Sequence, residues 1–275
     1  MTDSEKPPIR LERDGDVAVI VLDDPPLNLF TEETFTAMRA ARDEVADSDA
    51  RAMVFRAEGD LFTGGVDVGR VFKDVSGGAE GSRLAADGIR ELQAFESLEV
   101  PTLALVHGLC LTAGLEASLG CDMIWAADDA RFGLVERVVG LTPFGGGVQR
   151  MAERAGPARA REFVMTGDKY SAATLYEWGV INKVWPDEEL EERALELAKR
   201  LADGPTLAHA VRLTTSPGAP NDDTPFCPTP RPRPDARAGL NRSRANRRSQ
   251  VERRPGHRLG QQHQRQHQLE RHRQH

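Results

Sequence analysis

The chain has 275 residues, of which 39% are hydrophobic and 29% charged, a composition typical of a globular protein with a sizeable core. Its longest apolar runs have the length of strands, far below the ~20 residues of a membrane-spanning helix, and the first residues form no apolar signal-peptide core. The three cysteines, Cys110, Cys121 and Cys227, have neither disulfide-framework nor zinc-type spacing. These features argue against a membrane partner and favour the cytoplasm as the localisation.

The net charge of −7 is divided unevenly along the chain. Residues 1–213 carry 23 basic against 38 acidic residues, or −15, whereas residues 214–275 carry 13 arginines against five acidic residues, or +8. The acidic part argues against nucleic acid as a partner. The tail, 214–275, is rich in Pro, Arg, Gln and His, so it buries too little apolar surface to offset its ordering entropy, and we expect it to be disordered. Its abrupt change to arginine as the only basic residue suggests a frame-shifted ending.

The first third of the chain predicts two strands, a helix and a third strand. The strands Ile9–Glu12 and Val17–Leu22 flank an Asp-Gly turn. Thr31 is a capping residue for a helix whose apolar side chains, from Phe35 to Val45, recur at helical spacing. The elements expected after it are a strand at Ala52–Ala57, a glycine-rich loop at 58–67, a loop at 73–81 and a helix at 82–98.

The rest of the chain alternates short apolar runs with helical patterns, which is typical of an α/β domain with layered or spiral sheets. The expected strands are 102–107, 122–127 and 180–185. The expected helices are 112–120, Gly146–Ala155, Ala158–Met165, Ala172–Trp178 and a charged helix from Pro186 to Leu201. We expect a catalytic core at 1–185, a C-terminal helical region at 186–213 and the tail at 214–275.

Two glutamates stand in stretches that otherwise look buried: Glu116 in "LTAGLEASLGCD" and Glu136 in "FGLVERVVG". Judged by residue type alone, each is more often a solvated surface side chain. A helical wheel places Glu116 beside the apolar stripe of its helix rather than on it. The alternative is that both are held for chemistry, one as a base and one as an acid, at carbons next to a carbonyl group.

Backbone donors offer a partner for such chemistry. The first N–H groups of the helix 112–120 have no intrahelical acceptor and lie at the positive end of its dipole. The backbone at Gly64-Gly65-Val66 could present one more N–H, and two donors that meet at a carbonyl oxygen form an oxyanion hole. Alternatively, the glycines of "FTGGVD" and "LTPFGGGVQR" only form turns. Neither loop has the lysine and Ser/Thr of a phosphate-binding P-loop.

Four blocks in order, "PPLNLF", "LFTGGVD", "VHGLCLTAGLEASLGCDMIWAADDARFGLVE" and "GLTPFGGGVQRM", resemble the enoyl-CoA hydratase/isomerase (crotonase) superfamily over about residues 9–213. The resemblance implies a crotonase-like spiral of ββα units, with a C-terminal helical region that is atypical here. It implies catalytic roles for Glu116 and Glu136, and an oxyanion hole of the Val66 and Ala113 N–H groups. Further substrate-binding positions by resemblance are Gly64, Gly65, Asp67, Val68 and Gly114.

The same resemblance implies an acyl-CoA thioester substrate, with no cofactor apart from the coenzyme A of the substrate and no metal. It also implies a homotrimer or dimer of trimers, which the atypical tail would weaken. The family's usual three glycines before the first glutamate read Thr112-Ala113-Gly114 here, yet a backbone donor can still come from Ala113. The favoured activity is hydration of a 2-enoyl-CoA; the alternatives are an enoyl-CoA isomerase and a non-catalytic acyl-CoA-binding protein.

Overall fold

The computed structural model describes residues 6–73, 92 and 94–205. Residues 74–81 of the loop expected at 73–81, most of the helix expected at 82–98 and the whole tail lie outside these residues. The strands are β1 Ile9–Asp14, β2 Val17–Leu22, β3 Ala52–Ala57, β4 Thr102–Val106, β5 Leu109–Leu111, β6 Met123–Ala127, β7 Arg131–Gly133, β8 Tyr170–Ser171 and β9 Lys183–Trp185. The helices are α1 Glu32–Asp47, α2 Val68–Val71, η1 Ala94–Ser97, α4 Thr112–Leu119, η2 Glu136–Val139, α5 Gly147–Ala155, α6 Pro157–Thr166, α7 Ala172–Glu177 and α8 Asp187–Asp203.

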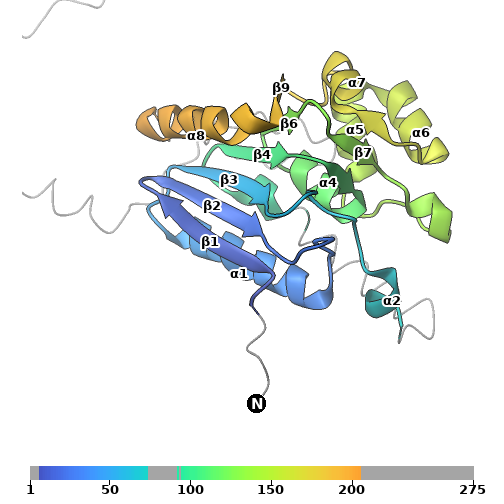
Figure 1. Ribbon diagram of the computed structural model, residues 1–275, viewed down its shortest axis with the longest axis horizontal. Coiled ribbons are helices and arrows are strands. Elements are labelled where there is room, and N and C mark those ends of the chain that lie inside the picture. The colour runs from blue at the N-terminus through green and yellow to red at the C-terminus, as the bar shows by residue number, and fades with distance from the viewer. Residues whose placement is uncertain (1–5, 74–91, 93, 206–275) are drawn as a thin grey trace, which may run out of the picture. The chain divides into compact units, whose positions relative to one another are not determined.

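The larger sheet has six strands in the order β1-β2-β3-β4-β6-β9 (Figure 1). The β1–β2 hairpin is antiparallel, and every later pair is parallel. All six residues of β2, "VAVIVL", are buried, as the unbroken apolar run predicts for a strand covered on both faces. The α/β class inferred from the sequence is therefore confirmed.

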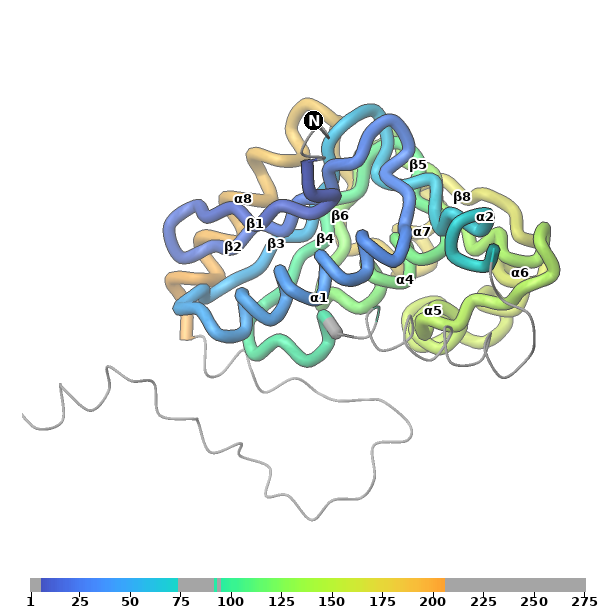
Figure 2. The backbone as a smooth tube through the Cα atoms, turned by 90° about the horizontal axis from the view of Figure 1, so that it is seen from below, coloured from blue at the N-terminus to red at the C-terminus, as the bar shows by residue number. Residues whose placement is uncertain are grey.

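Helices cover both faces of this sheet. Figures 1 and 2 show α1 on one face and α8 on the other, and the apolar side of α8 is formed by buried Leu190, Ala194, Ala198 and Ala202. Thr31 caps α1 as predicted, because its hydroxyl accepts a hydrogen bond from the Thr34 N–H at 3.3 Å.

A second sheet of three very short strands, in the order β5-β7-β8, was not predicted. Its strands have two or three residues each, too few for an alternating pattern to be visible in the sequence. The last strand of the larger sheet, β9, is also shorter than the predicted 180–185. Val180 and Ile181 are buried but precede the strand.

The helix α4 follows β5 directly and is buried along its whole length, from Thr112 to Leu119. The helical wheel placed Glu116 beside the apolar stripe, where a side chain would face solvent. This expectation is wrong, because the helix has no solvated face. Two isolated β-bridges pair Phe30 with Val66 and Thr63 with Cys110. They hold the loop at 63–67 between the residues that precede α1 and the strand β5. The fold thereby places this loop beside the first turn of α4.

Candidate active site

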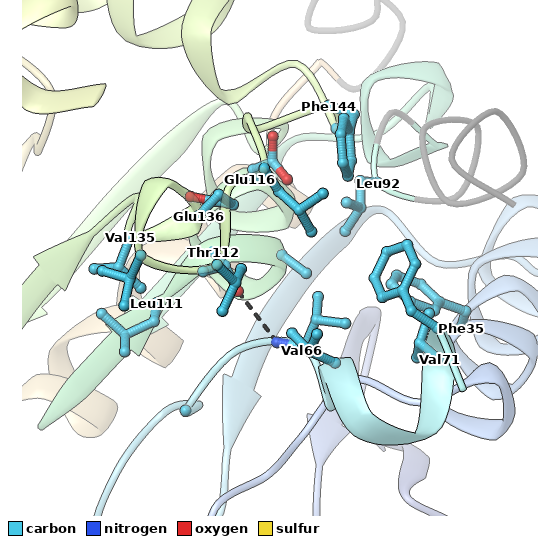
Figure 3. A pocket seen from close by; sticks show the side chains of 18 of the residues that line it. Phe35, Val66, Val71, Leu92, Leu111, Thr112, Glu116, Val135, Glu136 and Phe144 are labelled. Carbon is cyan, nitrogen blue, oxygen red and sulfur yellow. Dashed lines mark hydrogen bonds between the residues drawn. The ribbon is translucent and has the colours of Figure 1, made fainter. Parts of the chain in front are cut away.

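A cavity of about 690 Å³ opens between α1, the loop at 63–67, α4 and the segment that follows β7 (Figure 3). Its walls are mostly apolar. The apolar side chains that line it include Phe35, Val71, Phe72, Leu92, Leu141 and Phe144. Of the residues predicted for the site, Gly64, Val66, Val68, Ala113, Glu116 and Glu136 line this cavity. Segments that are far apart in the sequence, such as those of Gly64 and Glu136, thus meet at one place.

Glu116 is only 3% exposed, although it lines the cavity. Its carboxylate Oε1 accepts a hydrogen bond from the Gly147 N–H at 2.9 Å, at the first residue of α5. A helix N-terminus stabilises a negative charge, because its first N–H groups have no intrahelical acceptor. The solvated alternative that residue type favoured is therefore wrong for Glu116.

The glycines before α5 leave room for this carboxylate. A Cβ atom on Gly145 or Gly147 would lie 2.9 Å from a carboxylate oxygen of Glu116, closer than real Cβ contacts allow. Arg150 is 5% exposed and ties the loop down, since its Nη1 donates to the Gly145 carbonyl at 2.5 Å. The arginine also forms an ion pair with Glu96. The glycines of the "FGGG" run therefore let the backbone lie close to Glu116, in addition to forming a turn. The sequence alone did not indicate that Arg150 holds this loop in place.

Glu136 is the first residue of the short helix η2 and is 9% exposed, so it too is buried. Among the residues that the structure describes, its Oε2 atom has no hydrogen-bond partner. A buried carboxyl oxygen without a partner is unfavourable unless it is protonated or meets a ligand. The unpartnered oxygen belongs to a residue that lines the cavity, where a ligand could reach it.

Both carboxyl groups have strongly raised pKa values. Burial raises the pKa of Glu116 to about 7. The hydrogen bond from the Gly147 N–H lowers this pKa, and the negative charge of Glu136 raises it. Burial likewise raises the pKa of Glu136 to about 7, although a hydrogen bond from its own backbone N–H lowers this pKa. Two interacting groups in one site titrate as a pair. Near neutral pH the pair holds about one proton, which suits one base and one acid.

The two predicted backbone donors differ in their surroundings. Ala113 is the second residue of α4, so its N–H has no intrahelical acceptor, and it lines the cavity. The Val66 N–H instead donates to the hydroxyl Oγ1 of Thr112 at 3.2 Å (Figure 3). Thr112 has a φ of 47°, in the left-handed region that β-branched residues rarely adopt. The sequence did not indicate this bond, although a threonine where the resemblance implies glycine is a visible signal.

Three further predicted substrate-binding residues, Gly65, Asp67 and Gly114, are not among those that line the cavity. A Cβ atom on Gly65 would lie 2.3 Å from the Thr112 hydroxyl oxygen, and one on Gly114 would lie 2.1 Å from the Thr63 methyl carbon. The Asp67 side chain caps α2 by accepting from the Arg70 N–H at 3.0 Å. Their contact with a substrate stays a prediction.

Among the described residues, no group of His, Cys, Asp and Glu side chains is arranged to hold a metal ion. Within the same residues, no helix has both the length and the apolar character needed to cross a membrane.

The two sheets, with their covering helices and the cavity between α1 and α4, form an α/β crotonase fold. Residues 12–220 match the family described as enoyl-CoA hydratase/isomerase. The chain belongs to this family, the crotonase superfamily, as its four sequence blocks predicted.

Individual relatives agree with this assignment. The chain is 31% identical over 212 residues to a Bacillus subtilis (strain 168) protein named "Probable enoyl-CoA hydratase", covering 76% of this chain and 82% of the relative. It is 35% identical to a carnitinyl-CoA dehydratase of Salmonella typhimurium, covering 74% and 77%. A crystal structure of an enoyl-CoA hydratase subunit I from Geobacillus kaustophilus has a TM-score of 0.69 at 32% identity, covering 76% and 80%.

Proposed function

We propose that this protein is an enoyl-CoA hydratase, which adds water across the 2,3-double bond of a 2-enoyl-CoA thioester. The observation that carries the proposal is the pair of buried carboxyl groups, Glu116 and Glu136, in one apolar cavity with pKa values near 7. An apolar cavity suits an acyl chain, and a shared proton suits addition of the elements of water.

The proposed roles follow from the surroundings of the two groups. The Gly147 N–H and the nearby Arg150 charge favour the ionised form of Glu116, which would take a proton from water as the hydroxide adds to C3. The double-bond electrons move toward the thioester oxygen, which the Ala113 N–H and a second donor at the Val66–Thr112 contact would stabilise as an enolate oxygen. Glu136, in its protonated form, would then deliver a proton to C2, so that the product has gained one water.

The test follows the absorbance of the conjugated 2-enoyl thioester with the full-length protein. Hydration of crotonyl-CoA lowers this absorbance, whereas dehydration of carnitinyl-CoA or isomerisation of a 3-enoyl-CoA, as parallel substrates, raises it. Hydration of crotonyl-CoA supports the proposal. Turnover of only the 3-enoyl-CoA would instead assign an isomerase, which passes through the same enolate. Tight binding of all three without turnover would indicate a non-catalytic acyl-CoA-binding protein. The supporting argument against these alternatives is that two buried carboxyl groups, rather than one, line the cavity.

A further inference from the structure

Thr112 departs from the glycine that the family resemblance implies, and its hydroxyl lies at the proposed oxyanion hole. The residue lines the cavity and is 9% exposed. Its Oγ1 accepts the Val66 N–H at 3.2 Å, so the N–H does not point freely into the cavity (Figure 3). An incoming thioester oxygen would therefore meet the threonine hydroxyl before it met the Val66 N–H.

The backbone around this bond is fixed from both sides. The Phe30 N–H donates to the Gly65 carbonyl at 2.9 Å, and the Asp67 N–H donates to the Phe30 carbonyl at 3.0 Å. These two bonds flank Val66 and set the direction of its N–H. On the other side Thr112 keeps its unusual φ of 47°, although a β-branched residue disfavours it. A strained residue that persists beside a cavity is a reason to look for a function.

The Thr112 hydroxyl makes one hydrogen bond, as an acceptor, and can make a second one as a donor. It uses a lone pair to accept from Val66, and a threonine hydroxyl also carries one proton to donate. Among the described residues, the hydroxyl donates this proton in no hydrogen bond. A donor polarised by accepting a hydrogen bond donates more strongly in turn. The proton is therefore available to an oxygen atom in the cavity.

We propose that the Thr112 hydroxyl is a direct oxyanion-hole donor, which relays the Val66 N–H to the thioester oxygen of an acyl-CoA. The inference rests on the proposed function for the identity of the ligand. The Ala113 N–H supplies the second donor, from the adjacent residue of the same helix turn. The hole thus combines one side-chain and one backbone donor in place of two backbone donors.

Four substitutions separate this relay from the other roles that Thr112 could have. Thr112→Ser keeps the donor and should retain activity within a few-fold. Thr112→Val removes the hydroxyl at nearly constant volume and covers the Val66 N–H, so kcat should fall by about 100-fold. Thr112→Gly uncovers the Val66 N–H for direct contact and should retain activity within about tenfold. Thr112→Cys, a weak donor of nearly serine shape, should lie between serine and valine. The matched control is Thr174→Val on α7, a half-buried threonine whose hydroxyl contacts Ser171 outside the cavity.

The deciding readout does not require hydration. Butyryl-CoA labelled with ¹³C at its thioester carbonyl cannot be hydrated, and its infrared carbonyl stretch moves to lower frequency when donors polarise the oxygen. We expect such a shift with the unchanged protein, with Thr112→Ser and with the Thr174→Val control, and a smaller shift with Thr112→Val. An equal shift with Thr112→Val would overturn the relay alone. Thr112→Gly at least tenfold more active than the parent would also overturn it, because the hydroxyl would then be an obstacle. Absence of butyryl-CoA binding by the unchanged protein would remove the proposed function as well.

Discussion

Replacing Glu116 by glutamine should slow the reaction and, at the same time, stabilise the protein in alkaline solution. The glutamine amide keeps an oxygen that can accept the Gly147 N–H, so the helix contact survives. It cannot take a proton from water, and hydration of crotonyl-CoA should fall by about 10²–10⁴-fold. The same change removes a carboxylate that the fold holds out of water.

The size of the stability effect follows from the pKa of Glu116. A carboxyl group whose pKa is 4.5 in the unfolded chain and about 7 in the fold keeps its proton longer when folded. Its contribution to stability is complete below pH 4.5 and is lost as the pH rises through 7. The loss amounts to about 3 kcal/mol at pH 8, but only about 1 kcal/mol at pH 5. Glutamine does not titrate, so the Glu116→Gln variant does not lose this stability as the pH rises.

The assay is thermal unfolding of the parent and of Glu116→Gln at pH 5 and pH 8. For a folded part of about 200 residues, 1 kcal/mol moves Tm by roughly 2–4 °C. The advantage of the glutamine variant should therefore be about 4–8 °C larger at pH 8 than at pH 5. The control for the substitution itself is Glu192→Gln, at an exposed position of α8 beyond its first turn. An equal Tm difference at both pH values would refute the argued burial cost, and parent-like turnover would remove Glu116 from the mechanism.

Three other predictions test the rest of the site. Glu136→Gln should lower hydration by about 10²–10⁴-fold with coenzyme A binding almost unchanged, and an active variant would exclude Glu136 as the acid. The rate against pH should be bell-shaped with its maximum near 7, because protonation stops the base and ionisation stops the acid; a rate that is flat from pH 5 to 9 would contradict the shared proton. Ala113→Pro should lower activity at least ~100-fold, since proline has no N–H, whereas Ala113→Gly should be tolerated. Circular dichroism should show a folded proline variant, because proline is accepted in a first helical turn, and full activity there would place the hole elsewhere.

Local pattern predicted the elements whose determinants lie within a few residues. The run "VAVIVL" fixed β2, and Thr31 with the helical spacing after it fixed the start of α1. The strands β5, β7 and β8 could not be recognised in the sequence, because two or three residues are too few to show an alternating pattern. Such short strands form a sheet only when the rest of the chain has folded.

The site shows the same division between local and long-range causes. The apolar surroundings of Glu116 and Glu136 singled them out, but their catalytic roles came from the family resemblance, because their residue type favoured the surface. Burial of Glu116 depends on α5, whose first N–H lies 31 positions further along the chain. The hydrogen bond from Val66 to Thr112 spans 46 positions and needs an unusual φ that no pattern of apolar residues encodes.

The absence of a side chain at Gly147 has a consequence for how the family diverges. A methyl group there would lie 2.9 Å from Glu116, so the glycine is tied to the conformation of a carboxylate that belongs to another helix. Where a smaller residue replaced Glu116, the two closest contacts would disappear, and the tightest remaining contact would be Leu134 Cδ1 at 3.1 Å. The two positions should therefore covary, and a larger residue at the second would mark a lineage that has abandoned this proton-transfer chemistry.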